Sequence, residues 1–114
     1  MNVDRATAGL LPVTLSAPVT AVAHAHACDL TLRHDIGHTG ADGASLSDQL
    51  RQGGITALMV AENTASFFKT HQAAMQAWMA SPYHRENMQR PQVRAVGIGQ
   101  ADGTKALWVV DFTS

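Results

Sequence analysis

Hydrophobic positions in the first third of the chain follow the spacing of an amphipathic helix. Ser16 is a preferred N-cap residue, and Pro18 falls in the first turn that would follow it. An apolar stripe then recurs at i, i+3 and i+4, at positions Val19, Val22, Ala23, His26, Ala27 and Leu30. The pattern predicts one long helix that begins after Ser16 and ends near His34.

Shorter helical patterns lie on both sides of this segment. Residues 1–12 resemble the end of a helix that runs into a turn at Gly9 and Pro12, so we expect that the N-terminus of the domain has been trimmed. Ser45 and Asp48 have the spacing of a capping box. They predict a helix of about two turns, which the glycine pair at 53–54 would stop.

A further helical region lies between residues 70 and 88 and is interrupted once. Thr70 is a candidate N-cap for its first part. One apolar stripe follows at helical spacing, at Ala74, Met75, Trp78 and Met79. Ser81 followed by Pro82 is typical of a new helix start, so a second, short helix is expected there. His84 would lie in its first turn, where the positive end of the helix dipole disfavours imidazolium.

Strand-like patterns occupy the remaining apolar segments. Residues 55–64 are rich in β-branched and apolar side chains, and residues 93–99 and 105–112 are two further strands on either side of a turn at Asp102-Gly103. The last two strands predict an antiparallel hairpin. Together with residues 55–64 they can form a small sheet whose apolar face is covered by helices, which is an α+β fold built in layers.

Composition and charge narrow the class of protein. With 114 residues, 46% of them hydrophobic and 15% charged, the chain has the composition of a single globular domain spanning residues 1–114. A net charge of −1 with scattered Lys and Arg gives no electrostatic footprint for nucleic acid. No apolar run has the length of a membrane span. Met1 leads into Asn-Val-Asp-Arg without the apolar segment of a signal peptide, so we expect either a cytoplasmic protein or a chain from which a leader has been removed. Cys28 is the only cysteine, so no internal disulfide forms, and we expect a packed core thiol.

Histidines are the first candidates for chemistry. His26 falls on the apolar stripe of the long helix, where a histidine that is hydrogen-bonded inside the core is favoured over a ligand role. His34 and His38 have the i, i+4 spacing of a helical metal pair, but Gly37 and Gly40 argue against a continuous helix between them. We therefore interpret His38 as a loop histidine that stands over a pocket, and His34 as a residue at the C-terminal end of the long helix.

Glu62 is the only charged residue in the predicted strand 55–64. Burying an unpaired carboxylate costs free energy, so Glu62 must either face water or be held by polar partners. The sequence leaves these two alternatives open.

Five motifs occur in a fixed order along the chain. They are Gly37-His38-Thr-Gly40-Ala-Asp-Gly43, Ala61-Glu62-Asn63, Trp78-Met-Ala-Ser81-Pro-Tyr-His84-Arg-Glu-Asn87-Met, Val96-Gly-Ile-Gly99 and Trp108-Val-Val-Asp-Phe112. In order and spacing, over roughly residues 5–112, they resemble the CAP superfamily, also called SCP domains. This superfamily includes cysteine-rich secretory proteins, wasp-venom antigens, plant pathogenesis-related proteins and many small bacterial proteins.

The resemblance implies an α-β-α sandwich with a small central antiparallel sheet and a cleft lined by two histidines and two acidic residues. On this chain His38 matches the first histidine, Glu62 the first acid and His84 the second histidine. The position of the second acid is occupied by Ser81, and Ala61 stands where the family usually has glycine. The two histidines imply a site for a divalent cation such as zinc. Glu62 would be either its third ligand or the carboxylate that orients a histidine or the water from behind.

Three functions are compatible with such a cleft. The first is an exported binding module, secreted or facing the cell envelope, whose ligand is a peptide, a glycan or a lipid-like molecule, because no serine or cysteine lies in a recognisable nucleophile motif. The second is a metal-dependent hydrolase of peptides or cell-wall material, with Glu62 as general base. The third is a structural or interaction domain with a vestigial cleft. If His38 and His84 bind metal, affinity should fall below about pH 6, where imidazoles protonate.

Overall fold

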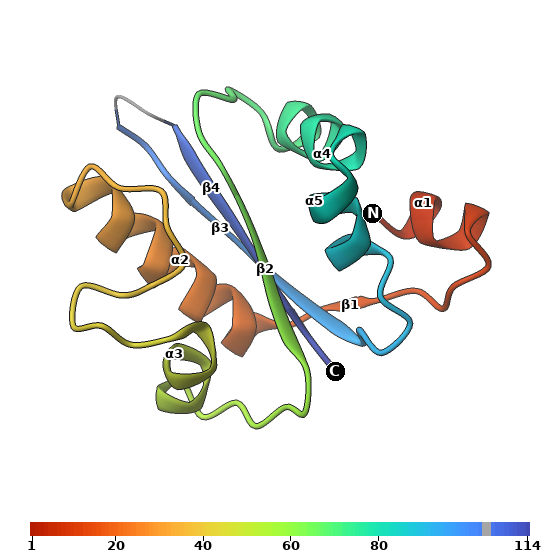
Figure 1. Cartoon of the computed structure of the whole chain (residues 1–114), viewed down its shortest axis with the longest axis horizontal. Coiled ribbons are helices and arrows are strands. Elements are labelled where there is room, and N and C mark those ends of the chain that lie inside the picture. Colours follow the sequence, from red (N-terminus) through yellow and green to blue (C-terminus); the bar gives the residue numbers. More distant parts are fainter. Residues whose placement is uncertain (104–105) are drawn as a thin grey trace.

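The structure is a computed structural model that describes residues 1–103 and 106–114 (Figure 1). In these ranges the helices are α1 (Asn2–Thr7), α2 (Ala17–Leu32), α3 (Leu46–Gln52), α4 (His71–Ala80) and α5 (Pro82–Met88). The strands are β1 (Thr14–Leu15), β2 (Val60–Ala65), β3 (Ala95–Ala101) and β4 (Leu107–Thr113). Each predicted helix and strand is present, but residues 55–59, predicted as strand, form an irregular connection before β2.

The described strands form one sheet in the order β1-β3-β4-β2, so β2 lies at an edge. β3 and β4 form the predicted antiparallel hairpin, and β2 pairs antiparallel with β4. β1 pairs parallel with β3, which makes the sheet mixed and not purely antiparallel as predicted. A strand of two residues is too short for an alternating pattern to reveal. The predicted start of the last strand at Lys105 lies outside the described residues.

Helices cover both faces of the sheet, as an α-β-α sandwich requires: α2 lies on one face, and α4 and α5 lie on the other (Figure 1). Successive residues of β4 divide between the two faces, because Val109 packs towards α2 and Val110 packs towards α4 and α5. The α2 side buries Ala23, Ala27, Leu30, Ala101 and Leu107. The opposite side buries larger side chains, among them Trp78, Met75, Met88 and Phe112.

Three of the predicted helix starts, those of α2, α3 and α4, are confirmed by capping bonds. Ser16 Oγ accepts a hydrogen bond from the Val19 N–H at 3.3 Å, and Thr70 Oγ1 caps α4 in the same way. Ser45 and Asp48 form a complete capping box at the start of α3. Side-chain oxygens therefore satisfy N–H groups that the first turns of these three helices leave unpaired.

The end of α2 differs slightly from the prediction. The helix ends at Leu32, and His34 follows with φ of 54°, so it lies just beyond the last turn in the left-handed region. His34 and His38 are consequently not neighbours on one helical face. Cys28 is half-buried against the α2-side core rather than enclosed in it, and its Sγ lies 3.6 Å from Nε2 of the exposed His24.

Two glycines of β3 allow α2 to approach the sheet backbone directly. A Cβ at Gly97 would lie 2.2 Å from the carbonyl carbon of Val19, and one at Gly99 would lie 2.4 Å from that of Ala23. Both distances are far inside van der Waals contact, so any side chain there would displace the helix. The motif Val96-Gly-Ile-Gly99 thus has a packing role, because it sets the separation between α2 and the sheet.

A buried arginine links α1 to the end of α5 and to the segment before β3. The Arg5 side chain donates hydrogen bonds to the carbonyl oxygens of Leu11 at 2.8 Å, Met88 at 2.9 Å and Arg90 at 3.0 Å. Burial lowers the pKa of Arg5, although an arginine remains protonated at neutral pH. The fork of N–H donors holds the N-terminal segment, the end of α5 and the approach to β3 together.

Candidate functional site

The candidate site lies at the edge strand β2, where the two layers of helices meet. Consecutive side chains of a strand point to opposite faces of its sheet. Glu62 therefore faces the α2 layer, and the next residue, Asn63, faces the α5 layer. Each residue fixes one of the two predicted histidines, so the Ala61-Glu62-Asn63 motif acts on both sides of the sheet.

Glu62 is buried and held by polar partners, which decides between the two alternatives left open by the sequence. Its side chain is 2% exposed, and its Oε1 accepts a hydrogen bond from His38 Nδ1 at 2.7 Å. His26 Nε2 lies 3.4 Å from the same oxygen. Burial alone raises the pKa of Glu62, but hydrogen bonds from His26, His38 and Asp111 outweigh it and lower the pKa to about 2. Glu62 is a carboxylate at neutral pH.

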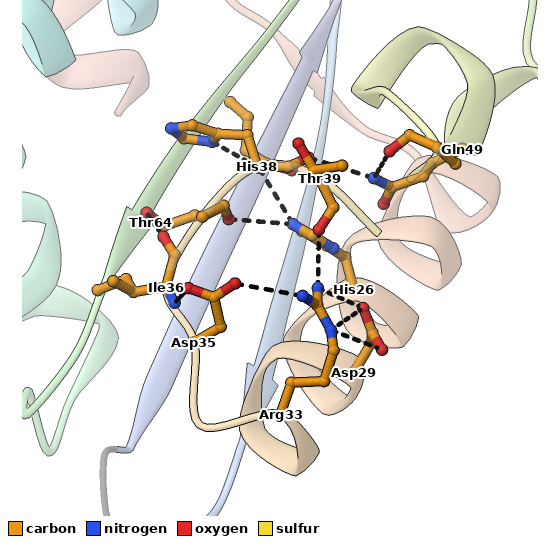
Figure 2. Close-up of polar contacts among 12 residues, drawn as sticks. His26, Asp29, Arg33, Asp35, Ile36, His38, Thr39, Gln49 and Thr64 are labelled. Carbon is orange, nitrogen blue, oxygen red and sulfur yellow. Dashed lines mark hydrogen bonds and ion pairs between the residues drawn. The ribbon is translucent and has the colours of Figure 1, made fainter. Parts of the chain in front are cut away.

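His38 stands on the loop between α2 and α3, as predicted, with its ring above β2 (Figure 2). Its side chain is 57% exposed, and Gln49 of α3 donates a hydrogen bond to its backbone carbonyl at 3.2 Å. The hydrogen bond to Glu62 raises the pKa of His38, partly opposed by burial. Because Nδ1 donates to a carboxylate, Nε2 is the nitrogen that His38 presents to a ligand.

His26 joins the same cluster from α2. Its side chain is 1% exposed, and its Nε2 lies 3.3 Å from the carbonyl oxygen of Gly37 as well as close to Glu62. The prediction of a buried, hydrogen-bonded core histidine is therefore confirmed. Its position beside Glu62 also makes His26 a second support of the carboxylate that holds His38.

Asp111 is a member of the cluster that sequence reasoning missed. It pairs with Glu62 across β2 and β4, and it is fully buried. Both its carboxyl oxygens and Oε2 of Glu62 are buried without an N–H or O–H donor among the other described residues. Burial and the neighbouring Glu62 raise the pKa of Asp111 to about 10, so its own proton is the donor that joins the two carboxyl groups. The alternation of side chains along the strand could have revealed it, because Asp111 lies on the same face of β4 as the buried residues Leu107 and Val109.

His84 is in the first turn of α5, as predicted, and is anchored through its backbone. Asn63 Nδ2 donates to the His84 carbonyl oxygen at 3.0 Å, and Asn87 Nδ2 donates to Asn63 Oδ1 at 2.9 Å. Asn87 Nδ2 also lies 3.3 Å from the carbonyl oxygen of Glu62. Partial burial and, to a smaller extent, the charge of His38 lower the pKa of His84.

Ser81 lies at the junction of α4 and α5. It is half-buried, and its side chain forms no capping bond to α5. It places a hydroxyl where the resemblance predicts a carboxylate. The acidic residues of the cluster are therefore Glu62 and, from a different strand, Asp111, and neither comes from the helical layer.

The donor set for a metal ion is smaller than a three-ligand site. Among residues 1–103 and 106–114, no group of three or more His, Cys, Asp or Glu side chains is arranged to hold a metal ion. Oε1 of Glu62 is engaged by His38 and His26, and Oε2 is buried. The available donors are Nε2 of His38 and the ring of His84, two imidazoles of the kind that zinc accepts. Glu62 fits the role of a carboxylate that orients a metal-binding histidine from behind.

Fold and motifs together define a CAP domain. The family model of the cysteine-rich secretory protein family, CAP, matches residues 1–112, and the chain belongs to this family. The chain is 27% identical over 111 residues to the uncharacterised protein YkwD of Bacillus subtilis and covers 97% of its own length and 43% of that protein. It therefore spans less than half of the length of this relative.

Solved structures have the same fold. An extracellular protein containing an SCP domain from Bacillus anthracis is 25% identical, with a TM-score of 0.92 over 98% of this chain and 37% of that chain. An outer surface protein of Borrelia burgdorferi is 21% identical, with a TM-score of 0.89 over 99% of this chain and 85% of that chain, a likeness of fold alone. Within the described residues, no helix has the length and apolar character needed to cross a bilayer.

Proposed function

We propose that this chain is an exported ligand-binding CAP domain whose binding site consists of His38 and His84 at the edge of the sheet. The observation that carries the proposal is the hydrogen bond of 2.7 Å from His38 Nδ1 to the buried Glu62 carboxylate. It fixes the ring of His38 with Nε2 directed to solvent. His84 is held separately through its backbone carbonyl by the Asn63 amide, so the His38 ring and the His84 backbone are both positioned before a ligand arrives.

A divalent cation such as zinc is the proposed cofactor of this site. His38 Nε2 and the His84 ring would hold it, and Glu62 would orient His38. The bound cation would supply a Lewis-acidic contact for a ligand oxygen or nitrogen. The ligand, which we propose to be a peptide, a glycan or a lipid-like molecule, would occupy coordination positions that the two imidazoles leave open.

The hydrolase alternative has less support from the geometry. A general base must reach the proton that it abstracts within hydrogen-bonding distance, either directly or through one water. The Glu62 side chain is 2% exposed, and the oxygen nearest the site already accepts from two histidines. Glu62 is therefore in a position to support His38 and in a poor position to activate a water molecule.

Export is proposed from the relatives. The solved structures with this fold include a protein described as extracellular and one described as an outer surface protein. The longer length of YkwD leaves room in that relative for further segments. Detection of the native protein in the culture supernatant or in the envelope fraction, against a cytoplasmic marker, tests this part of the proposal.

Zinc titration by calorimetry, with a parallel measurement of the melting temperature, tests the site. Zinc should bind the parent chain at about pH 7.5 and raise its melting temperature, because a ligand that binds only the folded state stabilises it. His38→Ala and His84→Ala should each weaken binding by about tenfold or more, as expected for the loss of one of two ligands. His24→Ala removes an exposed histidine outside the site and serves as the matched control.

The same titration distinguishes the remaining alternative. That alternative is a structural domain with a vestigial site. Such a site would also retain only two imidazole donors, with the buried cluster kept for stability. No heat of binding and no shift in melting temperature at saturating zinc would favour that alternative. Equal binding to the parent chain and to both site variants would contradict the assignment of His38 and His84.

A further inference from the structure

A second concave site lies on the other side of His26, between α2, α3 and the loop that joins them. Its volume is about 560 Å³, within the usual range for small-molecule pockets. One wall is formed by Ala21, Val22 and Ala25 of α2, and the opposite wall includes Ala41 and Ala44 of the loop. Neither His38 nor His84 lines this pocket.

The α2 wall forms an apolar stripe of its own. Pro18, Ala21, Val22 and Ala25 recur at helical spacing, next to the stripe that packs against the sheet. Ala21 and Ala25 are exposed, and Val22 is half-buried. α2 is thus apolar on two adjacent faces, and the pocket faces the one that the sheet does not cover.

His26 lines this pocket and carries a buried polar atom without a partner. The imidazole is 1% exposed, and its Nδ1 has no hydrogen-bond partner among the described residues. Its other nitrogen, Nε2, lies near two acceptors, the Glu62 carboxylate and the Gly37 carbonyl, and therefore carries the hydrogen in the neutral ring. Nδ1 is then a buried acceptor without a donor, on a residue that is part of the pocket lining. A buried acceptor without a donor costs free energy that a ligand hydroxyl or N–H would recover.

The charges around the pocket disfavour anions. The carboxylates of Asp29 and Asp42 both line it, and a hydrogen bond from Arg33 lowers the pKa of Asp29. Asp29 and Arg33 also form an ion pair at 2.8 Å at the edge of the pocket (Figure 2). A ligand carboxylate would approach two like charges and gain no unpaired cation in return.

We propose that this pocket binds a small uncharged organic molecule, with its apolar body against the α2 stripe and a hydroxyl group donating to His26 Nδ1. The site is separate from the histidine site above and does not depend on the proposed function. His26 belongs to both, because its Nε2 lies 3.4 Å from Glu62 Oε1 and the residue also lines the pocket.

Methyl NMR of the chain with labelled alanine and valine tests the proposal, with phenol, toluene and benzoate as probes. Phenol should shift the methyl signals of Val22, Ala25 and Ala44 in a saturable way. Toluene has the same ring without the hydroxyl and should bind about tenfold more weakly, the ratio expected for one hydrogen bond. Benzoate should produce no shifts at these methyl groups, because it is an anion.

Two variants, each with a matched control, test where the probe binds. Ala25→Leu fills the pocket from the exposed face of α2 and should weaken phenol binding at least tenfold, while Ala6→Leu, at an exposed alanine of α1, should leave it unchanged. His26→Asn should remove the preference for phenol over toluene, and His24→Asn, two residues away and exposed, should keep it.

Specific outcomes would overturn the proposal. Absence of methyl shifts up to the solubility limit of phenol, or shifts that persist unchanged in Ala25→Leu, would show that the pocket is not the binding site. Equal affinities for phenol and toluene in the parent chain would remove the role of His26. Because Ala25→Leu does not touch the buried cluster, this test stands even if His26→Asn fails to fold.

Discussion

The two faces of β2 hold the two histidines of the site by different physical means. On the α2 face, ionisable groups hold the His38 side chain, through a carboxylate that Asp111 and His26 support from behind. On the α5 face, neutral amides hold the His84 backbone, through Asn63 and Asn87. The first arrangement changes with pH and the second does not. One half of the site can therefore be altered by protonation while the other half keeps its geometry.

The two faces of the sheet also differ in how the helices pack against them. On the α2 face the helix contacts the strand backbone at Gly97 and Gly99, with no side chain between them. On the opposite face, large side chains such as Trp78 and Phe112 fill the space between helix and sheet. A large side chain can adopt another rotamer, whereas two contacting backbones cannot adjust separately. The α2 face should therefore tolerate steric change least.

Gly97→Ala should have the largest effect on stability. The new Cβ would meet the backbone of α2 at 2.2 Å, and the helix would have to move away from the sheet. We expect a loss of about 3 kcal/mol or more in the free energy of unfolding, measured by urea denaturation. Gly37→Ala is the matched control, since a Cβ there meets its nearest atom at 3.8 Å. Equal losses for the two variants would contradict the close approach of α2.

Arg5→Leu should have the next largest effect and acts on the opposite face. It removes the donors for several carbonyl groups near the end of α5 and the start of β3. We expect a loss of about 2–3 kcal/mol, because buried carbonyl groups lose their partners. Arg85→Leu, at an exposed residue of α5 with one hydrogen bond to Met79, should change stability by less than about 0.5 kcal/mol. A loss for Arg5→Leu no greater than this would show that the buried fork does not hold the segment.

Asp111→Asn should stabilise the fold at alkaline pH. A folded-state pKa of about 10 means that the folded chain holds a proton that the unfolded chain, with an ordinary pKa of 3.8, has released. The contribution of Asp111 is fully present below about pH 4 and is lost as the pH rises towards 10. Asn keeps a donor for Glu62 without this proton, so the variant should be about 1–2 kcal/mol more stable than the parent at about pH 8.

Denaturation curves between pH 5 and pH 9 measure this difference. The gain from Asp111→Asn should shrink as the pH falls, because the parent then protonates Asp111 at smaller cost. Asp102→Asn, at an exposed carboxylate, should show no such trend. A gain that is independent of pH would mean that Asp111 is not protonated in the folded chain.

The local parts of the fold could be predicted from the sequence. Caps such as Ser16 and Thr70 act within one turn, so residue spacing is enough to locate them. The roles of Arg5 and Asp111 could not be predicted, because their partners lie on segments far apart in sequence and depend on strand order and register.

The same distinction between local and long-range features applies to the candidate site. His38, Glu62 and His84 were identified from motifs, and the structure brings Glu62 and His38 into contact. That neither oxygen of Glu62 is open to a metal could not be inferred, because this depends on His26 and Asp111, which lie on other elements. The role of Glu62 thus depends on its burial, and burial arises only when the helices and the sheet have packed together.

Glu62→Gln should have the smallest effect on stability and the most specific effect on the two histidines. The amide can still accept from His38 Nδ1, but it carries no charge, so the main cause that raises the pKa of His38 is removed. The pKa of His38 should fall, as measured by NMR titration of its ring protons. The pKa of His84 should remain below the ordinary value, because burial is the first cause of its lowering and its amide anchors are uncharged. Glu86→Gln, at an exposed carboxylate of α5, should move neither histidine in the same way. If the two imidazoles instead shifted together in Glu62→Gln, the two faces of β2 would act as one electrostatic unit, and their separate control of the site would be wrong.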